Sequence, residues 1–451
     1  MARLLLLLAV VLAGVWWLRV LRPGWYWLVI SGPWAMVKVS SRYASVMDAC
    51  GLTVDPSRLR LTWARLAKRP IPPPRVPRLV GLRLTRTGLV LRIRLRPGQD
   101  AFDFSSSADR MRHAFGMQQV TSREVRAGLV EVRMTGYDVL RRVRMPRLDP
   151  GPGLRLPLAL CEDGSPWWRD YRQVPHALNL GATQSGKSVY QRRLITLLAS
   201  RSDVALVGID CKQGVELSPL ARRFSALVDN ADDALALLEA LIDRMEETYR
   251  VIRREQRISV DTPDAEITAD IWGLPASVRP TAVVVVVDEV AELSLFSTKE
   301  EEKRRDAIVT ALVRLAQLGR AAGIYLEICG QRFGADLGKG ITMLRAQLGG
   351  RVIHRLNDEG SAKMALGDMA PDAVLSTVQI SADRPGTAVA LNARGGWSLV
   401  RTPHTSLREA VNTCDAHAHL TPRLPELERF RPTTGGVSLI KSGPRPLSSA
   451  A

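Results

Sequence analysis

The chain of 451 residues has few cysteines and none in a metal-binding pair. Its cysteines are far apart, odd in number, and never form a C-x-x-C pair: Cys50, Cys161, Cys211, Cys329 and Cys414. This pattern argues against a disulfide framework or a zinc site and is typical of a reducing cytoplasm. The length predicts two or three domains. A hydrophobic content of 46% is ample for a folded core.

Acidic residues are scarce in the first third of the chain. Residues 1–150 contain 26 Lys or Arg but 9 Asp or Glu, whereas the remaining residues contain 37 and 36. The net charge of +18 is therefore concentrated in the N-terminal third. Such a field favours a polyanion as partner, either a nucleic acid or an anionic membrane surface.

Apolar runs at the N-terminus are short for a membrane span. Residues Leu4–Leu18 carry no charge, but as a helix they cover about 22 Å, less than a hydrocarbon core of about 30 Å. A second apolar stretch, Trp25–Val37, is broken by Gly32 and Pro33, and the tryptophans suit an interface belt. We expect a membrane anchor over residues 1–40, as one span with an interfacial segment or as a shallow hairpin. A cleaved signal peptide and a buried core helix are the alternatives.

A basic linker over residues 41–78 follows, ending in the stiff proline-rich stretch Pro70–Pro77. Beyond it the apolar residues alternate, which predicts a small basic α+β domain over residues 79–150. Within one expected strand, Arg92, Arg94 and Arg96 share a face. This face suits contact with nucleic-acid phosphates, and a solvated sheet face or a subunit contact is the alternative. No interleaved aromatic residues indicate base stacking.

A phosphate-binding loop stands at the centre of the chain. The pattern G-x-x-x-x-G-K-[ST] is met at every fixed position by Gly181, Ala182, Thr183, Gln184, Ser185, Gly186, Lys187 and Ser188. An apolar strand ending at Leu180 precedes it, and a helix over Val189–Ser200 follows, as phosphate binding requires. Lys187 would reach the β- and γ-phosphates of ATP, and Ser188 would hold Mg²⁺. The alternative is a chance match in a glycine-rich loop.

Two carboxylates follow a run of five valines. The stretch Thr281–Val287 reads as a doubly covered strand and leads into Asp288 and Glu289. Opposite a phosphate loop, Asp288 would hold Mg²⁺ through water and Glu289 would act as general base. The alternative is an acid-rich helix start. A further apolar strand over Val204–Ile209 ends in the segment Asp210–Leu217, at the edge where α/β folds place ligands.

Two more polar residues are candidates for the reaction. Gln331 follows the apolar strand Ile324–Cys329, where it would sense the γ-phosphate, or it is a turn residue. Arg320 follows the helix Ala307–Leu318. It would act as an arginine finger on a neighbouring subunit's nucleotide, or it is a cation favoured at a helix C-terminus.

Together these stretches resemble the FtsK/SpoIIIE family of DNA-pumping ATPases over about residues 175–402. The resemblance is carried by GATQSGKSV, GIDCKQGVEL, MEETYRVIRR, VVVVVDEVAEL, RLAQLGRAAGI, the GQR after Cys329, and RVIHRLND. It implies an α/β, RecA-like P-loop NTPase domain over residues 151–405, assembled into a homo-hexameric ring that threads double-stranded DNA using ATP and Mg²⁺. It also implies that Gln331 is the sensor and that Arg320, rather than Arg314, is the finger.

Within that family the chain looks most like the conjugal transfer proteins of actinomycete mobile elements. The resemblance implies tethering to the bacterial inner membrane with the ATPase domain in the cytoplasm, where ATP is available. The residues after 405 are expected to form a partly disordered tail, too short for a full DNA-reading winged helix, and Phe333 replaces the usual proline. A chromosome-partitioning pump, a protein-secretion ATPase and a non-motor membrane scaffold are the alternative functions.

Overall fold

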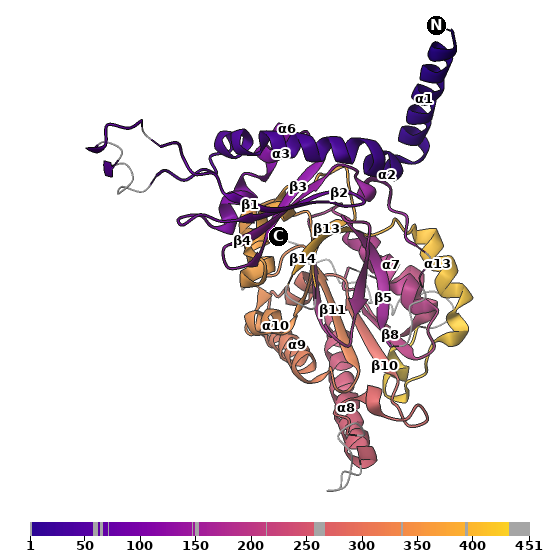
Figure 1. Ribbon diagram of the computed structural model, residues 1–451. Helices are drawn as coiled ribbons and strands as arrows, with labels where there is room; N and C mark the ends of the chain where they lie inside the picture. The colour runs from indigo at the N-terminus through magenta and orange to yellow at the C-terminus, as the bar shows by residue number, and fades with distance from the viewer. Residues whose placement is uncertain are drawn as a thin grey trace, which may run out of the picture. The chain divides into compact units, whose positions relative to one another are not determined.

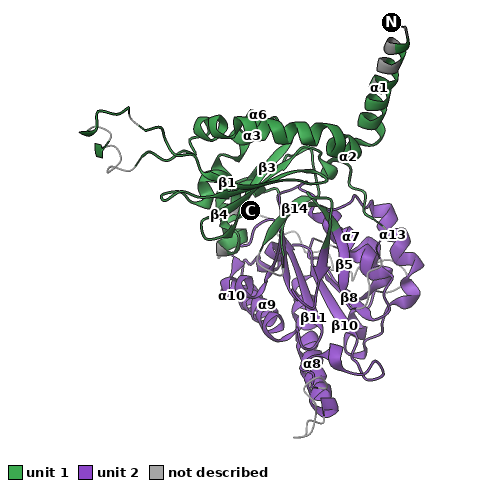
Figure 2. Ribbon diagram, viewed as in Figure 1, with its two compact units in different colours: residues 1–146, 159–167, 355–401 green, residues 147–158, 168–354, 402–451 purple. Residues whose placement is uncertain are grey.

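The computed structural model describes residues 2–56, 62–63, 66–70, 72–146, 148, 153–212, 214–256, 267–334, 337–392 and 396–432. The chain folds into two compact units, each assembled from separate stretches of sequence (Figure 2). Unit 1 comprises residues 1–146, 159–167 and 355–401, and unit 2 comprises residues 147–158, 168–354 and 402–451. Of the expected C-terminal tail after residue 405, residues 433–451 lie outside the described residues, whereas residues 406–432 are described.

Unit 1 contains a four-stranded antiparallel sheet in the order β1-β2-β4-β3. Its strands are β1 (Arg78–Leu84), β2 (Gly88–Arg94), β3 (Gln119–Arg126) and β4 (Leu129–Thr135). The predicted alternation is confirmed, because Leu89, Leu91 and Ile93 are buried while Arg92 and Arg94 are exposed. Between β2 and β3 the chain forms two helices, α5 (Ala101–Ser106) and α6 (Ala108–Phe115), separated at Ser107.

Helices cover one face of this sheet (Figure 1). The N-terminal helices are α1 (Ala2–Leu21), α2 (Pro23–Tyr26), the π-helical turn η1 (Trp27–Ser31) and α3 (Gly32–Ala49). One side of α3 packs through Val39, Tyr43 and Met47 into the core formed with β2 and β4. Helix α3 therefore crosses the boundary at residue 40 that the sequence analysis placed between anchor and linker. Of the residues described, none belongs to a helix that is long and apolar enough to cross a membrane.

The rest of unit 1 comes from two later stretches of the chain. Strands β13 (Thr387–Leu391) and β14 (Trp397–Arg401) pair antiparallel, and β14 also pairs with β5 (Arg155–Cys161). The last stretch also contains α11 (Glu359–Leu366), η8 (Gly367–Met369), η9 (Pro371–Ala373) and α12 (Val374–Val378), whereas η2 (Val139–Arg142) belongs to the first stretch and β6 (Pro166–Asp170) is divided between the units after Trp167. Arg384 forms an ion pair with Asp138, so the late stretch is joined to the early one by charge as well as by packing.

Unit 2 is built on a parallel sheet in the order β12-β7-β11-β10-β8-β9. Its strands are β7 (Ala177–Leu180), β8 (Val204–Ile209), β9 (Phe224–Val228), β10 (Ala282–Val287), β11 (Ile324–Gly330) and β12 (Gly350–His354). All six residues of β10 are buried, as its run of valines predicts for a strand covered on both faces. The expected α/β architecture is thus present in this unit.

The order of the strands fixes where the helices lie. Parallel crossovers are right-handed, so α7 (Lys187–Ala199) lies on one face, whereas α8 (Ala231–Gln256), α9 (Lys299–Leu318) and α10 (Ile341–Gln347) lie on the other (Figure 1). Helix α13 (Leu407–Ala416) packs on α7. Helix α9 begins eight residues before the predicted start, because Thr298 and Glu301 form a capping box there. Short 3₁₀ helices complete the unit: η3 (Ser218–Arg223), η5 (Ile271–Gly273), η6 (Val290–Ser294), η10 (Ala418–Leu420) and η11 (Pro425–Phe430).

A buried ion pair lies within the sheet of unit 2. Arg169 Nε donates to Glu327 Oε1 at 2.6 Å, and both side chains are almost fully buried. Arg169 also donates to the carbonyl oxygens of Val174 and Pro175, and Glu327 lies in the middle of β11. The pair thus ties the segment that leads into β7 to the strand beside it.

We predict that Arg169→Ala strongly destabilises the protein. The substitution leaves the Glu327 carboxylate buried without its cation, which costs about 3–5 kcal/mol in the free energy of unfolding. Urea denaturation followed by tryptophan fluorescence measures the change. The exposed Arg250, paired with Glu247 on one helix, provides the control, since Arg250→Ala should change stability by less than about 0.5 kcal/mol. Equal effects of the two substitutions would contradict this account.

Candidate functional site

The phosphate loop joins the end of β7 to the start of α7. Gln184 and Gly186 have left-handed backbones, with φ of 62° and 105°. At Gly181 a side chain would clash, because a Cβ there would lie 2.3 Å from Ser185 Oγ and 2.7 Å from His354 Cβ. The Ser185 N–H donates to Ala182 O at 3.0 Å, which curls the loop. Backbone N–H groups in such a curl, together with the positive end of α7, make an anion-binding concavity.

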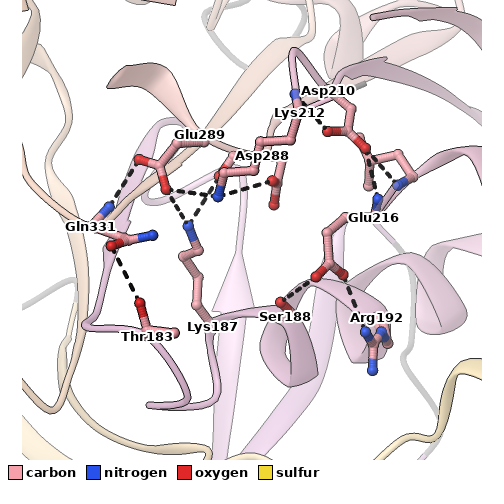
Figure 3. A network of polar contacts seen from close by, with 11 residues as sticks. Thr183, Lys187, Ser188, Arg192, Asp210, Lys212, Glu216, Asp288, Glu289 and Gln331 are labelled. Carbon is pink, nitrogen blue, oxygen red and sulfur yellow. Dashed lines mark hydrogen bonds and ion pairs between the residues drawn. The ribbon is translucent and has the colours of Figure 1, made fainter. Parts of the chain in front are cut away.

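Lys187 extends from this loop to the end of β10 (Figure 3). Its ammonium donates to Glu289 Oε2 at 2.9 Å and to the Asp288 carbonyl oxygen at 3.3 Å. Lys212, which follows β8, lies 3.1 Å from Glu289 Oε2 and 3.8 Å from Asp288 Oδ2. The structure therefore brings together the phosphate-loop lysine and both carboxylates that the sequence analysis singled out.

The two neighbouring carboxyl groups differ in their electrostatics. Burial raises the pKa of Asp288, and the attraction of Lys187 offsets it only in part. Burial would also raise the pKa of Glu289, but Lys187, the Gln331 N–H and Lys212 together lower it. Glu289 is thus held ionised by its partners, whereas Asp288 is buried with less compensation.

The residues at Asp288 fit a divalent cation. Asp288 is 1% exposed, and neither carboxylate oxygen has a hydrogen-bond partner in the part of the chain that is described. A buried carboxylate in this condition is costly unless a cation neutralises it. The Ser188 hydroxyl donates to Glu216 Oε1 at 3.1 Å. Carboxylate and hydroxyl oxygens are ligands that suit Mg²⁺, and Ser188 would exchange Glu216 for the metal.

Gln331 lies at the same edge of the sheet. Its backbone N–H donates to Glu289 Oε1 at 2.9 Å, and its side-chain oxygen accepts from Thr183 Oγ1 at 3.4 Å. Gln331 thus connects the general-base candidate with the phosphate loop (Figure 3).

Arg320 lies at the opposite edge. It is exposed just before β11 begins, whereas the phosphate loop follows the end of β7, which runs parallel to β11. It lines a pocket of about 310 Å³ with other residues of unit 2: Leu154, Arg155, Asp170, Arg172, Gln173, Asp270, Trp272 and Tyr325. The structure therefore does not bring Arg320 to the phosphate loop of its own chain.

Three polar residues of the site had no assigned role in the sequence analysis. Asp210 Oδ2 accepts the backbone N–H groups of Glu216 and Leu217 at 2.9 Å, which shapes the loop after β8. That loop presents Lys212 to Glu289 and Glu216 to Ser188. Its position at the carboxyl end of a strand was the available signal. The partners of Lys212 and Glu216 could not be predicted from the sequence, because the loop has no periodic pattern.

Comparison with known proteins identifies the family. Residues 140–335 match the sequence profile of the FtsK/SpoIIIE family, and residues 12–136 match that of the actinomycete conjugal transfer protein N-terminal domain. Over 396 residues the chain is 67% identical to the transfer protein TraSA of Streptomyces ambofaciens, covering 88% of this chain and 95% of that protein. The chain belongs to the FtsK/SpoIIIE family.

The resemblance inferred from the motifs is thereby confirmed. Another family relative is a sporulation regulatory protein of Streptomyces azureus, 56% identical over 283 residues that cover 61% of this chain and 89% of that one. Among solved structures, the conjugation coupling protein TcpA of pCW3, in its monomer form with ATPγS, gives a TM-score of 0.52 at 16% identity. The alignment covers 82% of this chain and 98% of TcpA. That likeness shows the shared α/β P-loop ATPase fold.

We predict that removing the two carboxylates has opposite effects on stability without added nucleotide. The raised pKa of Asp288 means that its ionised form costs stability at neutral pH, a cost that fades as the pH falls. Asp288→Asn should therefore stabilise the protein at pH 7.5, by about 1–2 kcal/mol. The lowered pKa of Glu289 means that its charge contributes stability above the unfolded-state pKa and that this contribution is lost on acidification. Glu289→Gln should destabilise by about 1–3 kcal/mol.

Thermal denaturation between pH 4 and pH 8 measures both effects, and each should shrink toward the acidic end. If both substitutions shifted the melting temperature in the same direction at pH 7.5, the two carboxyl groups would not differ in their electrostatics as described.

Proposed function

We propose that the chain is a membrane-tethered, ATP-driven translocase that moves double-stranded DNA during conjugal transfer. The observation that carries the proposal is the contact of Lys187 with Glu289 beside the buried carboxylate of Asp288, whose oxygens accept no hydrogen bond within the described residues. Family membership gives that arrangement its context, and the likeness to TraSA over nearly all of both chains favours transfer over chromosome partitioning or protein secretion.

In this proposal Lys187 changes partner when ATP binds. Its ammonium leaves Glu289 for the β- and γ-phosphates, which the loop N–H groups also hold. Glu289 keeps the Gln331 N–H and Lys212 as donors, and the place that Lys187 leaves at Oε2 opens to the attacking water, whose proton Glu289 accepts. Asp288 and Ser188 would hold Mg²⁺, which when bound neutralises charge on the phosphates. Gln331 would report the state of the nucleotide, because it contacts both Thr183 and Glu289.

Membrane tethering is assigned to the N-terminal helices. Several of their tryptophans are more than half exposed, namely Trp16, Trp17, Trp25 and Trp34. Exposed tryptophans beside arginines suit the interface of a bilayer. A chain held in this way at the cytoplasmic face of the inner membrane keeps its ATPase unit in contact with ATP.

We predict that duplex DNA stimulates ATP hydrolysis by the full-length protein in detergent or nanodiscs. Rates of hydrolysis with long duplex DNA, with single-stranded DNA and without DNA give the comparison.

Two substitutions test the site itself. Glu289→Gln should reduce the rate by about 10²–10⁴-fold, since it removes the base, and Lys187→Ala should abolish both hydrolysis and plasmid transfer. Arg250→Ala is the control. The full chain is needed, because truncation at residue 40 would cut through α3. Absence of stimulation at low salt would contradict a DNA motor, and transfer by the Lys187→Ala variant would indicate a scaffold.

We further predict that Arg320 acts on a neighbouring subunit of a homo-hexameric ring. Its place away from its own phosphate loop supports action in trans. Arg320→Ala and Lys187→Ala should each be inactive alone, and a mixture should regain measurable hydrolysis, because some interfaces then pair an intact loop with an intact arginine. A mixture as inactive as its components would refute the finger and leave Arg320 a structural cation.

A further inference from the structure

Arginines cover one face of the four-stranded sheet in unit 1. The other face packs on the helices, so residues that alternate with the core positions Leu91 and Ile93 point away from them. The register sorts these outward residues into rows across the strands. The central row contains Arg92, Glu131 and Arg123. The end row contains Arg78, Arg94, Leu129 and Arg126.

The central row contains an anion of its own. Glu131 is 4% exposed and lies 2.7 Å from Arg123, 3.0 Å from Arg133 and 3.7 Å from Arg92. Burial would raise the pKa of Glu131, but Arg123 and Arg133 lower it, so the carboxylate stays ionised. The fold therefore supplies an anion where these arginines meet.

The end row has no such anion. Arg78 stands directly opposite Arg94, and Arg126 lies on the same face two strands beyond Arg94. All three are exposed, and within the described residues none forms an ion pair. Like charges placed directly opposite on neighbouring strands oppose pairing. A hollow of about 510 Å³ lies beside them, lined by Arg94, Leu95, Arg126, Ala127, Gly128 and Leu129.

The three arginines that the sequence predicted to share a face therefore have different partners. Arg92 faces Glu131, and Arg96 donates through Nε to the Val76 carbonyl oxygen at 3.0 Å. Of that set, Arg94 has neither an ion pair nor a side-chain hydrogen bond among the described residues, and Arg78 and Arg126 lie in the same row on other strands.

We infer that Arg78, Arg94 and Arg126, here called the arginine row, bind the phosphate backbone of DNA without reading its sequence. Strands lie about 4.8 Å apart, so the row spans about 14 Å, a length over which duplex DNA presents about eight phosphate charges. A phosphate supplies the anion that Glu131 provides in the neighbouring row, and no aromatic side chain stands among the three for base stacking. The inference rests on the proposed function and adds the surface that DNA contacts.

Anionic lipid is the competing polyanion, and the layout of the unit argues against it. The exposed apolar side chains of α3, Trp34 and Val37, point away from the sheet that Met47 and Val39 of the same helix pack against. The arginine row lies on the far face of that sheet. A bilayer in contact with the outer side of α3 therefore does not reach the arginine row.

The test compares full-length Arg78→Ala/Arg94→Ala/Arg126→Ala with a matched triple variant, Arg250→Ala/Arg254→Ala/Arg314→Ala. The control removes the same charge from arginines that already have acidic partners. Fluorescence anisotropy with a 30-base-pair duplex, titrated from 50 to 300 mM salt, gives the affinity and its salt slope. Removing the arginine row should lower the slope by about 2–3, at about 0.9 per phosphate contact. At 100 mM salt the affinity should fall on the order of 10–100-fold, equally for unrelated sequences. The control should bind like wild type.

Three results would overturn the inference. One is an unchanged affinity and slope for a variant whose circular dichroism and melting temperature match wild type. Another is an equal loss in the control triple. The third is loss of binding to phosphatidylglycerol vesicles with DNA binding intact, which would assign the arginine row to lipid. If wild type itself bound no DNA, the proposed function would fail first, and that result is distinguishable because it does not depend on the variants.

Discussion

The parallel pairing of β7, β11 and β10 is the constraint on which the site depends. Gly330 of β11 stands level with Leu180 of β7, and Val287 of β10 stands level with Ile328 of β11. Three loops far apart in sequence therefore leave the sheet at one edge. That alignment allows a lysine after β7 to reach a carboxylate after β10 at 2.9 Å. A strand slipped by one residue would turn these side chains to the other face and separate the phosphate loop from its acids.

Sequence predicted the features that repeat or belong to a motif. The five valines of β10, the alternation in β2 and the phosphate loop all lie where expected, because each is fixed by local pattern. The early start of α9 was missed, since its first two turns are charged and owe their helix to a cap rather than to an apolar stripe. Glu327 was read as part of an apolar strand. Its partner Arg169 is 158 residues away, and no local pattern reports a contact made by folding.

The N-terminal region shows how composition can conceal packing. The apolar stretch Trp25–Val37 suggested a membrane segment, yet Trp27 is 5% exposed and donates through its indole N–H to the Thr85 carbonyl oxygen at 3.1 Å. Gly136 makes room for this ring, because a Cβ there would lie 2.0 Å from it. Trp34 on the next helix is 71% exposed. The same residue type thus serves the core and the surface, and only the position on the helix distinguishes the two.

Buried ionic groups occur in both units. Two buried carboxylates have ionic partners, Glu327 with Arg169 and Glu131 with Arg133. The ion pair of Lys187 shares its anion with other donors, because Glu289 also accepts hydrogen bonds from Lys212 and from the Gln331 N–H. Glu289 therefore keeps two donors when Lys187 turns to a phosphate, and the exchange leaves neither charge stranded. If Lys187 were the only donor to Glu289, its move to a phosphate would leave a buried carboxylate without any partner. The cost of that isolated charge would oppose nucleotide binding. The carboxylate shared with Lys212 and the Gln331 N–H lowers this cost, which is what the proposed exchange of Lys187 between Glu289 and a phosphate requires.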